Sequence, residues 1–447
     1  MPITKTLTRL ICLVLTPTDW IWKYRVLTIF VATLAHWSVP PVHAFVIETK
    51  GGPKIRTEDG NFELGFNARA HLDVHSFNAD TAHGPPPFGS QIPNLDERNG
   101  FNWRRTYTTL TGKIHDLNFK FENDFAAGSF PSSLRENWLS TRLGLGQIIL
   151  GQFKPYRSME ELTSSNEINM MERPSTSSTG IYSGRQFLVG AGYKGIVADQ
   201  LGYSADVMTL ANAGTPYKGM TYGTRLYWFP FKEDGNTLHF GFSYSVDEPD
   251  PRSLRARVVD IYGGRRGISK SLGIAGASAS AGGESRQTTF AAEAAYSMGP
   301  VTLQGEYANA QLDNTHLLAE AQKDSMIQAY YVQGSWFVTG EKTPYRKDRG
   351  AFGKPKPISK WGALELAVRY DVAENLDQNL MEDPCDTRTT KCRVEVITLG
   401  ANWYVRQGLR FMLNYYLTEA SIGNSGPGMP NRKDSPSVIS FRTQLSF

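Results

Sequence analysis

Apolar and polar residues alternate along most of the chain after residue 60. In residues 238–246 the even positions, from Leu238 to Val246, are all apolar, whereas the odd positions hold histidine, glycine and serine. Residues 364–372 and 409–417 repeat the pattern, with arginine on the polar face. A period of two residues is typical of β-strands whose two faces meet different surroundings. The pattern therefore predicts an all-β fold.

About sixteen such segments follow one another, each long enough for a tilted crossing of a bilayer. They lie near residues 62–77, 101–114, 118–126, 134–143, 146–154, 185–195, 200–211, 219–231, 236–247, 286–297, 300–311, 326–339, 361–373, 392–405, 408–420 and 436–447. The connections after odd-numbered segments are mostly long polar loops, at 78–100, 155–184, 248–285, 312–325, 374–391 and 421–435. Tight turns such as 144–146 and 406–408 follow the even-numbered segments, and the long connection 340–360 is the exception.

This alternation in connection length separates two β architectures. A soluble β-sandwich shares the period of two, but it has no reason to keep long loops on one side. A transmembrane antiparallel β-barrel has long external loops and short periplasmic turns. The sequence therefore predicts a transmembrane antiparallel β-barrel of about sixteen strands over residues 61–447.

The N-terminus has the features of an export signal. Lys23 and Arg25 precede an apolar run at residues 26–35, and the small-residue site Val42-His43-Ala44 follows. This order of charge, short apolar core and small residues is typical of a secretory signal peptide, and the run is too short to span a bilayer as a helix. We expect residues 1–44 to be a signal peptide cut after Ala44 and residues 45–60 to be a short periplasmic segment. An earlier apolar patch leaves the true translation start open.

The other end of the chain indicates the same destination. The last amphipathic segment closes on Phe447, with Phe441 and Leu445 on its apolar face. A C-terminal phenylalanine at the end of such a strand resembles the recognition signal of bacterial outer-membrane barrels. We therefore expect the protein in the bacterial outer membrane.

Composition and charge add little to this picture. The 447 residues have 40% hydrophobic content and a mean hydropathy of −0.35, which excludes a helical membrane protein. The net charge is +4, but residues 1–44 carry four basic residues and one acid, so the remainder is at +1. Bulk charge therefore points to no partner, and no nucleic acid is expected.

Two cysteines remain after the export signal is removed. Cys385 and Cys392 lie seven residues apart within a long polar loop. In an exported chain this spacing favours a disulfide that closes a loop tip. A metal site is the alternative, but no histidine lies nearby.

Several stretches resemble the family of phosphate-selective porins O and P. The first group consists of residues 151–156 (GQFKPY), 159–165 (MEELTSS) and 171–174 (MERP), and it resembles that family's third-loop segment. The second group consists of residues 336–341 (WFVTGE), 344–346 (PYR), 350–353 (GAFG) and 361–366 (WGALEL). The resemblance implies a sixteen-stranded barrel, commonly trimeric, in which inward-folded segments form an anion-attracting constriction. The family's rows of luminal arginines and lysines form no contiguous motif, so they cannot be assigned residue by residue.

Three segments are expected to fold inward, residues 155–184, 248–285 and 340–360, and positive charge is concentrated in the last two; basic residues mark the start and end of the first, at Lys154, Arg157, Arg173 and Arg185. Residues 252–271 carry six basic residues against one acid, and residues 340–360 carry seven against two. An anion-selective pore lines its narrow part with arginine and lysine, which replace the hydration shell of an oxyanion. The candidate selectivity residues are therefore Lys154, Arg157, Arg185, Arg252, Arg255, Arg257, Arg265, Arg266, Arg346, Lys347 and Arg349. The alternative is that these are solvated loops or basic patches that face lipopolysaccharide phosphates.

The expected function is passive passage of small anions, with phosphate or polyphosphate first. It needs no cofactor, and the expected surroundings are outer-membrane lipid and lipopolysaccharide. Acidic and basic residues both occupy inward positions of the strands, so a porin without phosphate preference stays open, as does a structural or adhesive barrel. An enzyme is not expected, because the chain has no G-x-S-x-G, Walker-type or HExxH motif. His71 and His75 share a strand face but lack a third ligand, so no metal site is expected.

Overall fold

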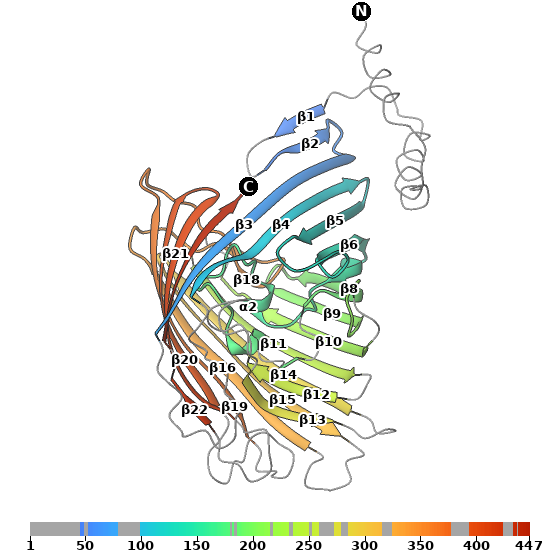
Figure 1. The fold of residues 1–447 in the computed structure, drawn as a ribbon. Helices are drawn as coiled ribbons and strands as arrows, with labels where there is room; N and C mark the ends of the chain where they lie inside the picture. Colours follow the sequence, from blue (N-terminus) through green and yellow to red (C-terminus); the bar gives the residue numbers. More distant parts are fainter. Residues whose placement is uncertain are drawn as a thin grey trace, which may run out of the picture.

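The protein forms a closed antiparallel barrel of sixteen strands (Figure 1). The computed structural model describes residues 45–48, 52–78, 99–178, 181–182, 186–214, 218–231, 236–249, 253–258, 272–278, 285–314, 324–376, 393–422, 432–435 and 437–447. The barrel strands are β3 (Phe62–Asn78), β4 (Gly100–Ile114), β5 (Leu117–Asp124), β6 (Leu134–Leu143), β7 (Gly146–Phe153), β8 (Leu188–Val197), β9 (Leu201–Thr209), β10 (Gly219–Trp228), β11 (Asn236–Pro249), β14 (Ser285–Met298), β15 (Val301–Asn314), β16 (Asp324–Phe337), β19 (Ala363–Asn375), β20 (Arg393–Arg406), β21 (Leu409–Ile422) and β23 (Ser437–Ser446). Each pairs with its neighbour in sequence, and β23 pairs with β3 to close the ring. The predicted fold class is confirmed.

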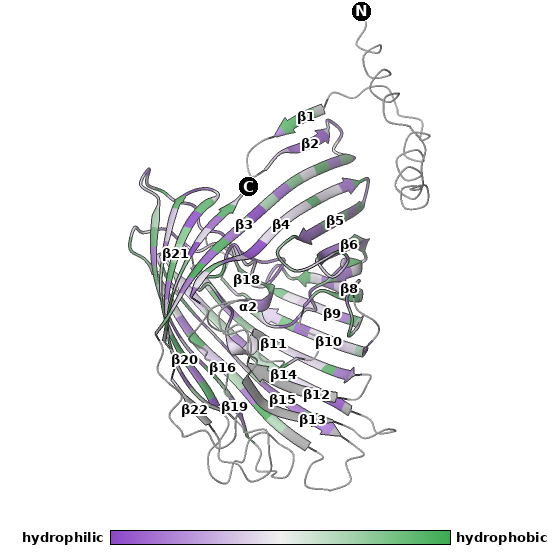
Figure 2. Ribbon diagram, in the orientation of Figure 1, coloured by the Kyte–Doolittle hydropathy of each residue, from purple (hydrophilic) through white to green (hydrophobic). Residues whose placement is uncertain are grey.

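The two faces of the strands differ as the alternation predicts. On β19, Leu366 and Val368 are 42% and 50% exposed, whereas Glu365 and Arg369 are 2% and 0% exposed. Hydrophobic and hydrophilic residues alternate along the strands (Figure 2). The exposed, outward residues are apolar and the buried, inward residues are polar. A barrel in a bilayer needs this arrangement, because lipid surrounds the outside and water or polar loops fill the inside. Among the described residues, no helix is both long enough and apolar enough to cross a membrane.

A short hairpin extends the sheet at one end of the barrel. Strands β1 (Phe45–Glu48) and β2 (Lys54–Thr57) pair with each other, and β2 pairs with the start of β3. The hairpin lies near the C-terminus (Figure 1). It occupies residues 45–60, which the sequence assigns to a short N-terminal segment. Strand β22 (Arg432–Asp434) extends β21 in a similar way.

Two further hairpins form separate small sheets. Strands β12 (Ser253–Val258) and β13 (Leu272–Ser278) lie within the connection between β11 and β14, and β13 lies beside β16 and β19. Strands β17 (Tyr345–Arg346) and β18 (Ala351–Phe352) lie in residues 338–362, here called the turn-side connection, between β16 and β19. Residues 154–187, here called the third loop, join β7 to β8 and hold the short helices α2 (Met159–Leu162) and α3 (Ser175–Ser178).

Candidate functional site

The third loop crosses the barrel interior and is fixed to the wall by buried ion pairs. Glu172 accepts hydrogen bonds from Arg104 on β4, at 2.8 and 2.7 Å, and from Arg442 on β23, at 3.2 Å. Arg442 also donates to both oxygens of Asp73, at 2.6 and 2.7 Å. Burial raises the pKa of Glu172, but Arg104 and then Arg442 outweigh it and hold the pKa well below its usual range. Glu172 is therefore an ionised anchor between two strands of the wall.

Arg157 fixes the start of the loop to the opposite wall. Its guanidinium donates to Asp206 at 3.3 Å, to Asp247 at 3.4 Å and to the Thr221 hydroxyl at 3.0 Å. The residue is 1% exposed. Two carboxylates balance its charge, so Arg157 has the surroundings of a structural arginine rather than of an open anion site.

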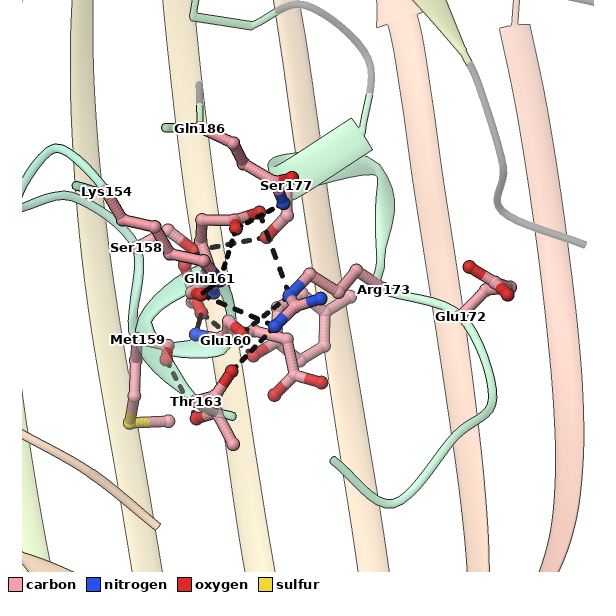
Figure 3. A network of polar contacts seen from close by, with 12 residues as sticks. Lys154, Ser158, Met159, Glu160, Glu161, Thr163, Glu172, Arg173, Ser177 and Gln186 are labelled. Carbon is pink, nitrogen blue, oxygen red and sulfur yellow. Dashed lines mark hydrogen bonds and ion pairs between the residues drawn. The ribbon is translucent and has the colours of Figure 1, made fainter. Parts of the chain in front are cut away.

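Arg173 and Lys154 hold the α2 turn together (Figure 3). Arg173 donates to the carbonyl oxygens of Glu160 at 3.0 Å and Thr163 at 2.6 Å. Lys154 donates to the Glu161 carbonyl oxygen at 2.6 Å and pairs with its carboxylate at 2.8 Å. Burial, and next the neighbouring Arg173, lower the pKa of the Lys154 ammonium to about 8, although Glu161 opposes this. Lys154 is thus a cation whose charge varies near neutral pH.

The turn-side connection enters from the opposite end of the barrel. Arg225 on β10 donates to the carbonyl oxygens of Arg349 and Gly350, both at 2.7 Å, and the Tyr227 hydroxyl donates to that of Lys347 at 2.7 Å. Gly350 has φ +57°, and a Cβ there would lie 2.8 Å from the Tyr227 ring. Only glycine fits this close approach without strain.

The third loop and the turn-side connection meet inside the barrel. Met159 of α2 packs with Ala351 and Phe352 of β18, against Ala295 of β14. Tyr345 packs against the same cluster. Two segments that enter from opposite ends therefore narrow the lumen at one level.

A cavity of about 440 Å³ remains beside this contact. Eight cationic side chains line it: Arg69, Arg105, Lys120, Lys154, Arg173, Lys194, Arg225 and Arg349. Four acidic side chains line it as well: Glu122, Glu136, Glu167 and Asp348. The wall of the cavity thus has an excess of positive charge, although the strands alternate acids and bases elsewhere.

Most of these cations already have carboxylate partners. Arg69 pairs with Glu122 at 2.7 Å, and Lys120 pairs with Glu136 at 2.6 Å. Arg105 is different, because its side chain makes no hydrogen bond or ion pair with the described residues, and its Nη1 is buried without a partner. Within the described part of the chain, the Lys194 ammonium has no carboxylate within ion-pair distance, and its one hydrogen bond is to the carbonyl oxygen of Asp348 at 3.4 Å. Buried donors without protein partners are places where a ligand or water can bind. Arg369 and Arg410, elsewhere in the lumen, also have such donors, but among the described residues Arg105 is the arginine with such a donor that lines this cavity.

A β-bulge gives Arg105 its position. In the pairing of β3 with β4, His71 lies opposite Arg105 and Leu72 lies opposite Trp103, so Arg104 is the extra residue. Arg104 and Arg105 are 6% and 7% exposed, whereas Trp103 on the outer face is 56% exposed. Sequence reasoning missed both arginines. The available signal was two consecutive arginines in an otherwise alternating strand, since a lipid-facing position does not accept either.

The structure places the selectivity residues predicted from sequence in different surroundings. Lys154 and Arg349 line the cavity, Arg157 is buried where the third loop meets the wall, and Arg346 and Lys347 have side chains that are 45% and 40% exposed. Arg255 and Arg257 lie on β12, where only the backbone is described. Outside the described residues lie Arg185, Arg252, Arg265, Arg266, Cys385 and Cys392.

The two histidines on β3 are engaged in hydrogen bonds. His71 Nε2 bonds Asn166 at 2.9 Å, and His75 Nδ1 bonds Ser440 at 2.7 Å. Among the described residues, no three His, Cys, Asp or Glu side chains are grouped so that they would hold a metal ion.

The family model for phosphate-selective porin O and P matches residues 89–447. The chain belongs to this family. Porin O of Pseudomonas aeruginosa is 27% identical over 406 residues, which are 85% of this chain and 89% of that protein. The resemblance expected from the third-loop and turn-side motifs is confirmed.

Solved structures of other porins have the same fold. An anion-selective porin from Comamonas acidovorans has a TM-score of 0.53 at 12% identity and covers 86% of this chain and 100% of its own. The trimer form of OmpT from Vibrio cholerae gives 0.52 at 11% identity, over 86% and 99%. The DcaP channel of Acinetobacter baumannii gives 0.52 at 10% identity, over 88% and 99%. At these identities the likeness concerns the fold alone.

Family and fold together make this protein a channel of the bacterial outer membrane and not an enzyme. The cut after Ala44 stays a prediction, because residues 1–44 lie outside the described part of the chain.

Proposed function

We propose that this porin is a passive channel that prefers small anions, with phosphate or polyphosphate as its first solute. The observation that carries the proposal is Arg105, a buried cation that faces the cavity without a partner among the described residues. A guanidinium in this state binds an oxyanion through short, charge-assisted hydrogen bonds. Lys194 supplies a second cation without a carboxylate partner in the same cavity.

Selectivity then follows from the balance between capture and release. An anion that enters the narrow part loses water, and Arg105 and Lys194 replace the lost contacts. A cation finds the excess positive charge of the wall and is repelled. Tight binding would stop conduction, so the sites must be several and moderate. The ion pairs of Arg69 and Lys120 keep those two cations from binding an anion strongly.

Cations at the two ends of the pore also attract anions in this proposal. Arg346 and Lys347 on the turn-side connection have side chains that are 45% and 40% exposed, so their charges face water. Exposed cations at a pore mouth raise the local concentration of anions in a way that depends on salt. At the other end, the basic residues of the 248–285 connection have the corresponding role in this proposal.

Assembly and surroundings belong to the proposal as well. OmpT of Vibrio cholerae has a trimer form, and we expect a homotrimer here, embedded in outer-membrane lipid and lipopolysaccharide. Large apolar side chains such as Leu399 and Phe441, which are 48% and 40% exposed, provide the outer surface that lipid or a second copy covers.

A porin without phosphate preference is the second candidate. The observation in its favour is that Glu122 and Glu136 neutralise part of the positive wall. In that case phosphate and chloride would pass alike.

Planar-bilayer recording of the purified protein in potassium chloride, with phosphate titrated in, tests the proposal. We expect phosphate to block the chloride current, and Arg105→Ala to raise the half-blocking concentration about tenfold or more, because a hydrogen bond to a charged group contributes roughly 1.5–3 kcal/mol. Arg406→Ala, which removes an exposed arginine at the β20–β21 turn, is the matched control and should behave as the parent protein. A parent current that ignores phosphate would favour the second candidate.

A further inference from the structure

Aromatic and aliphatic side chains share the cavity wall with the cations. Going around the wall from β5 to β8, the apolar lining side chains are Trp138, Ile149 and Phe153, between Lys120 on β5 and Lys194 on β8. Polar side chains on the same strands line the wall as well: Glu122, Glu136 and Gln147. Neighbouring strands lie about 4.8 Å apart, so roughly 14 Å of wall separates the two lysine strands. Three apolar side chains lie in that interval, and its carboxylate, Glu136, is paired with Lys120 at 2.6 Å. The interval is wide enough for a flat organic ring with its charged group at one side.

The rings next to this interval are set into the wall by a glycine. Phe153 and Tyr156 lie with ring centroids 5.6 Å apart. A Cβ at Gly192 on β8 would lie 2.8 Å from both rings. The position that would otherwise carry a luminal side chain is therefore given to aromatic rings. The Lys194 ammonium lies 5.9 Å from the Tyr156 ring centroid, so cation and ring face the same space.

A second cation of the cavity is placed in the same way. The Lys154 ammonium lies 5.6 Å from the centroid of the Phe187 ring, and both line the cavity. Cations over ring faces attract by about 0.5–1 kcal/mol where water has access. Each such pair offers a solute an apolar face and a positive charge together.

An inorganic oxyanion interacts with the cations of this wall but not with its apolar side chains. Phosphate is hydrated on every side, so it gains nothing from Trp138, Ile149 or the rings beside them. A planar apolar body would gain mainly by covering the partly buried ring of Trp138, at about 25 cal/mol per Å², because Ile149, Phe153 and Tyr156 are already buried. The cavity volume of about 440 Å³ also falls among sites for small organic molecules, roughly 300–1,000 Å³.

We propose that the cavity is a site for organic anions with an aromatic body, the aryl carboxylates and aryl phosphates. The ring packs on Trp138 and Ile149, and the anionic group meets Lys194 or Arg105. This inference rests on the proposed anion preference and adds the class of solute. Trp138 is a specificity residue in this account, because it touches the solute's ring and not its charge.

Pairs of anions with the same charged group test the inference. Block of the chloride current is measured for benzoate against acetate, and for phenyl phosphate against inorganic phosphate. We expect the aromatic member of each pair to block at a roughly three- to tenfold lower concentration, the factor that aromatic packing supplies. Trp138→Leu should remove this advantage, and Trp138→Phe should retain most of it. Trp403→Leu, on the outer face where Trp403 is 45% exposed, is the control for folding and should retain all of it.

The outcomes separate this inference from the proposed function. If benzoate equals acetate and phenyl phosphate equals inorganic phosphate, while reversal potentials still favour anions, the aromatic site is refuted and the anion channel stands. If the parent protein shows no anion preference, both proposals fail. An aromatic advantage that survives Trp138→Leu would refute the placement of the ring on β6.

Discussion

Glu172 of the third loop receives three hydrogen bonds from two arginines, whereas Arg105 in the cavity beside it has an Nη1 with no partner. The two regions use the same residue type within one lumen. In the anchor of the third loop, carboxylates surround the arginines and the pairs hold chain segments together. In the cavity, the cationic side chains that line the wall outnumber the acidic ones. From this difference we infer that the unpaired arginines, rather than the number of luminal arginines, set the proposed selectivity.

Removing the anchor should have the largest effect. Glu172→Ala takes away the carboxylate that Arg104 and Arg442 share. Breaking a buried ion pair on one side costs about 3 kcal/mol or more. We expect that loss in the free energy of unfolding in urea, together with a larger single-channel conductance as the third loop loosens. Glu48→Gln is the control, because Glu48 and its partner Arg56 have side chains that are 42% and 46% exposed, and it should cost under about 1 kcal/mol. An unchanged conductance in a destabilised Glu172→Ala would contradict the anchoring role.

Replacing an ion-paired arginine should lower the free energy of unfolding more than replacing an unpaired one. Arg157→Ala leaves the buried carboxylates of Asp206 and Asp247 without this guanidinium, and we expect a loss of about 3 kcal/mol. Arg105→Ala removes a buried cation with no hydrogen bond or ion pair among the described residues, so its loss should be clearly smaller, about 1 kcal/mol. Urea unfolding of both variants measures this contrast. Equal losses would mean that Arg105 has a structural partner after all.

The packing of the turn-side connection against the Tyr227 ring can be tested by substituting two glycines. Gly350 has φ +57° and Gly299 has φ +56°, but a Cβ would meet the Tyr227 ring at 2.8 Å only at Gly350. Both alanine variants share the cost of a left-handed backbone, roughly 1 kcal/mol. Gly350→Ala should therefore lose about 1 kcal/mol more than Gly299→Ala and show a noisier open-channel current. Identical thermal stabilities and currents would argue against the close approach.

The smallest expected effect is a pH dependence from Lys154. Its pKa near 8 means that the ammonium is mostly charged at pH 7 and mostly neutral at pH 9. The cavity then loses one positive charge as pH rises through about 8, so anion preference should weaken modestly between these values. Reversal potentials under a salt gradient measure it. Lys154→Arg, which keeps its charge, should show a flatter profile; a profile as steep as the parent's would assign the change to another group.

The sequence predicted the barrel because a period of two residues is a local property that each strand carries by itself. It missed Arg104 and Arg105 because a bulge breaks that period at one place. The sequence analysis named both Arg157 and Arg349 as selectivity candidates, because it does not show which arginines have an ion-pair partner elsewhere in the chain. Asp73 and Arg442 are 369 positions apart and meet only when the ring closes.

The central claim is that unpaired luminal cations set the preference for anions. Reversal potentials in a potassium chloride gradient test it most directly, on the parent and on Arg105→Ala/Lys194→Gln. We predict that the parent is anion-selective and that the double variant loses most of this selectivity, while its unfolding free energy stays close to that of the parent. An unchanged reversal potential in a folded double variant would contradict the account.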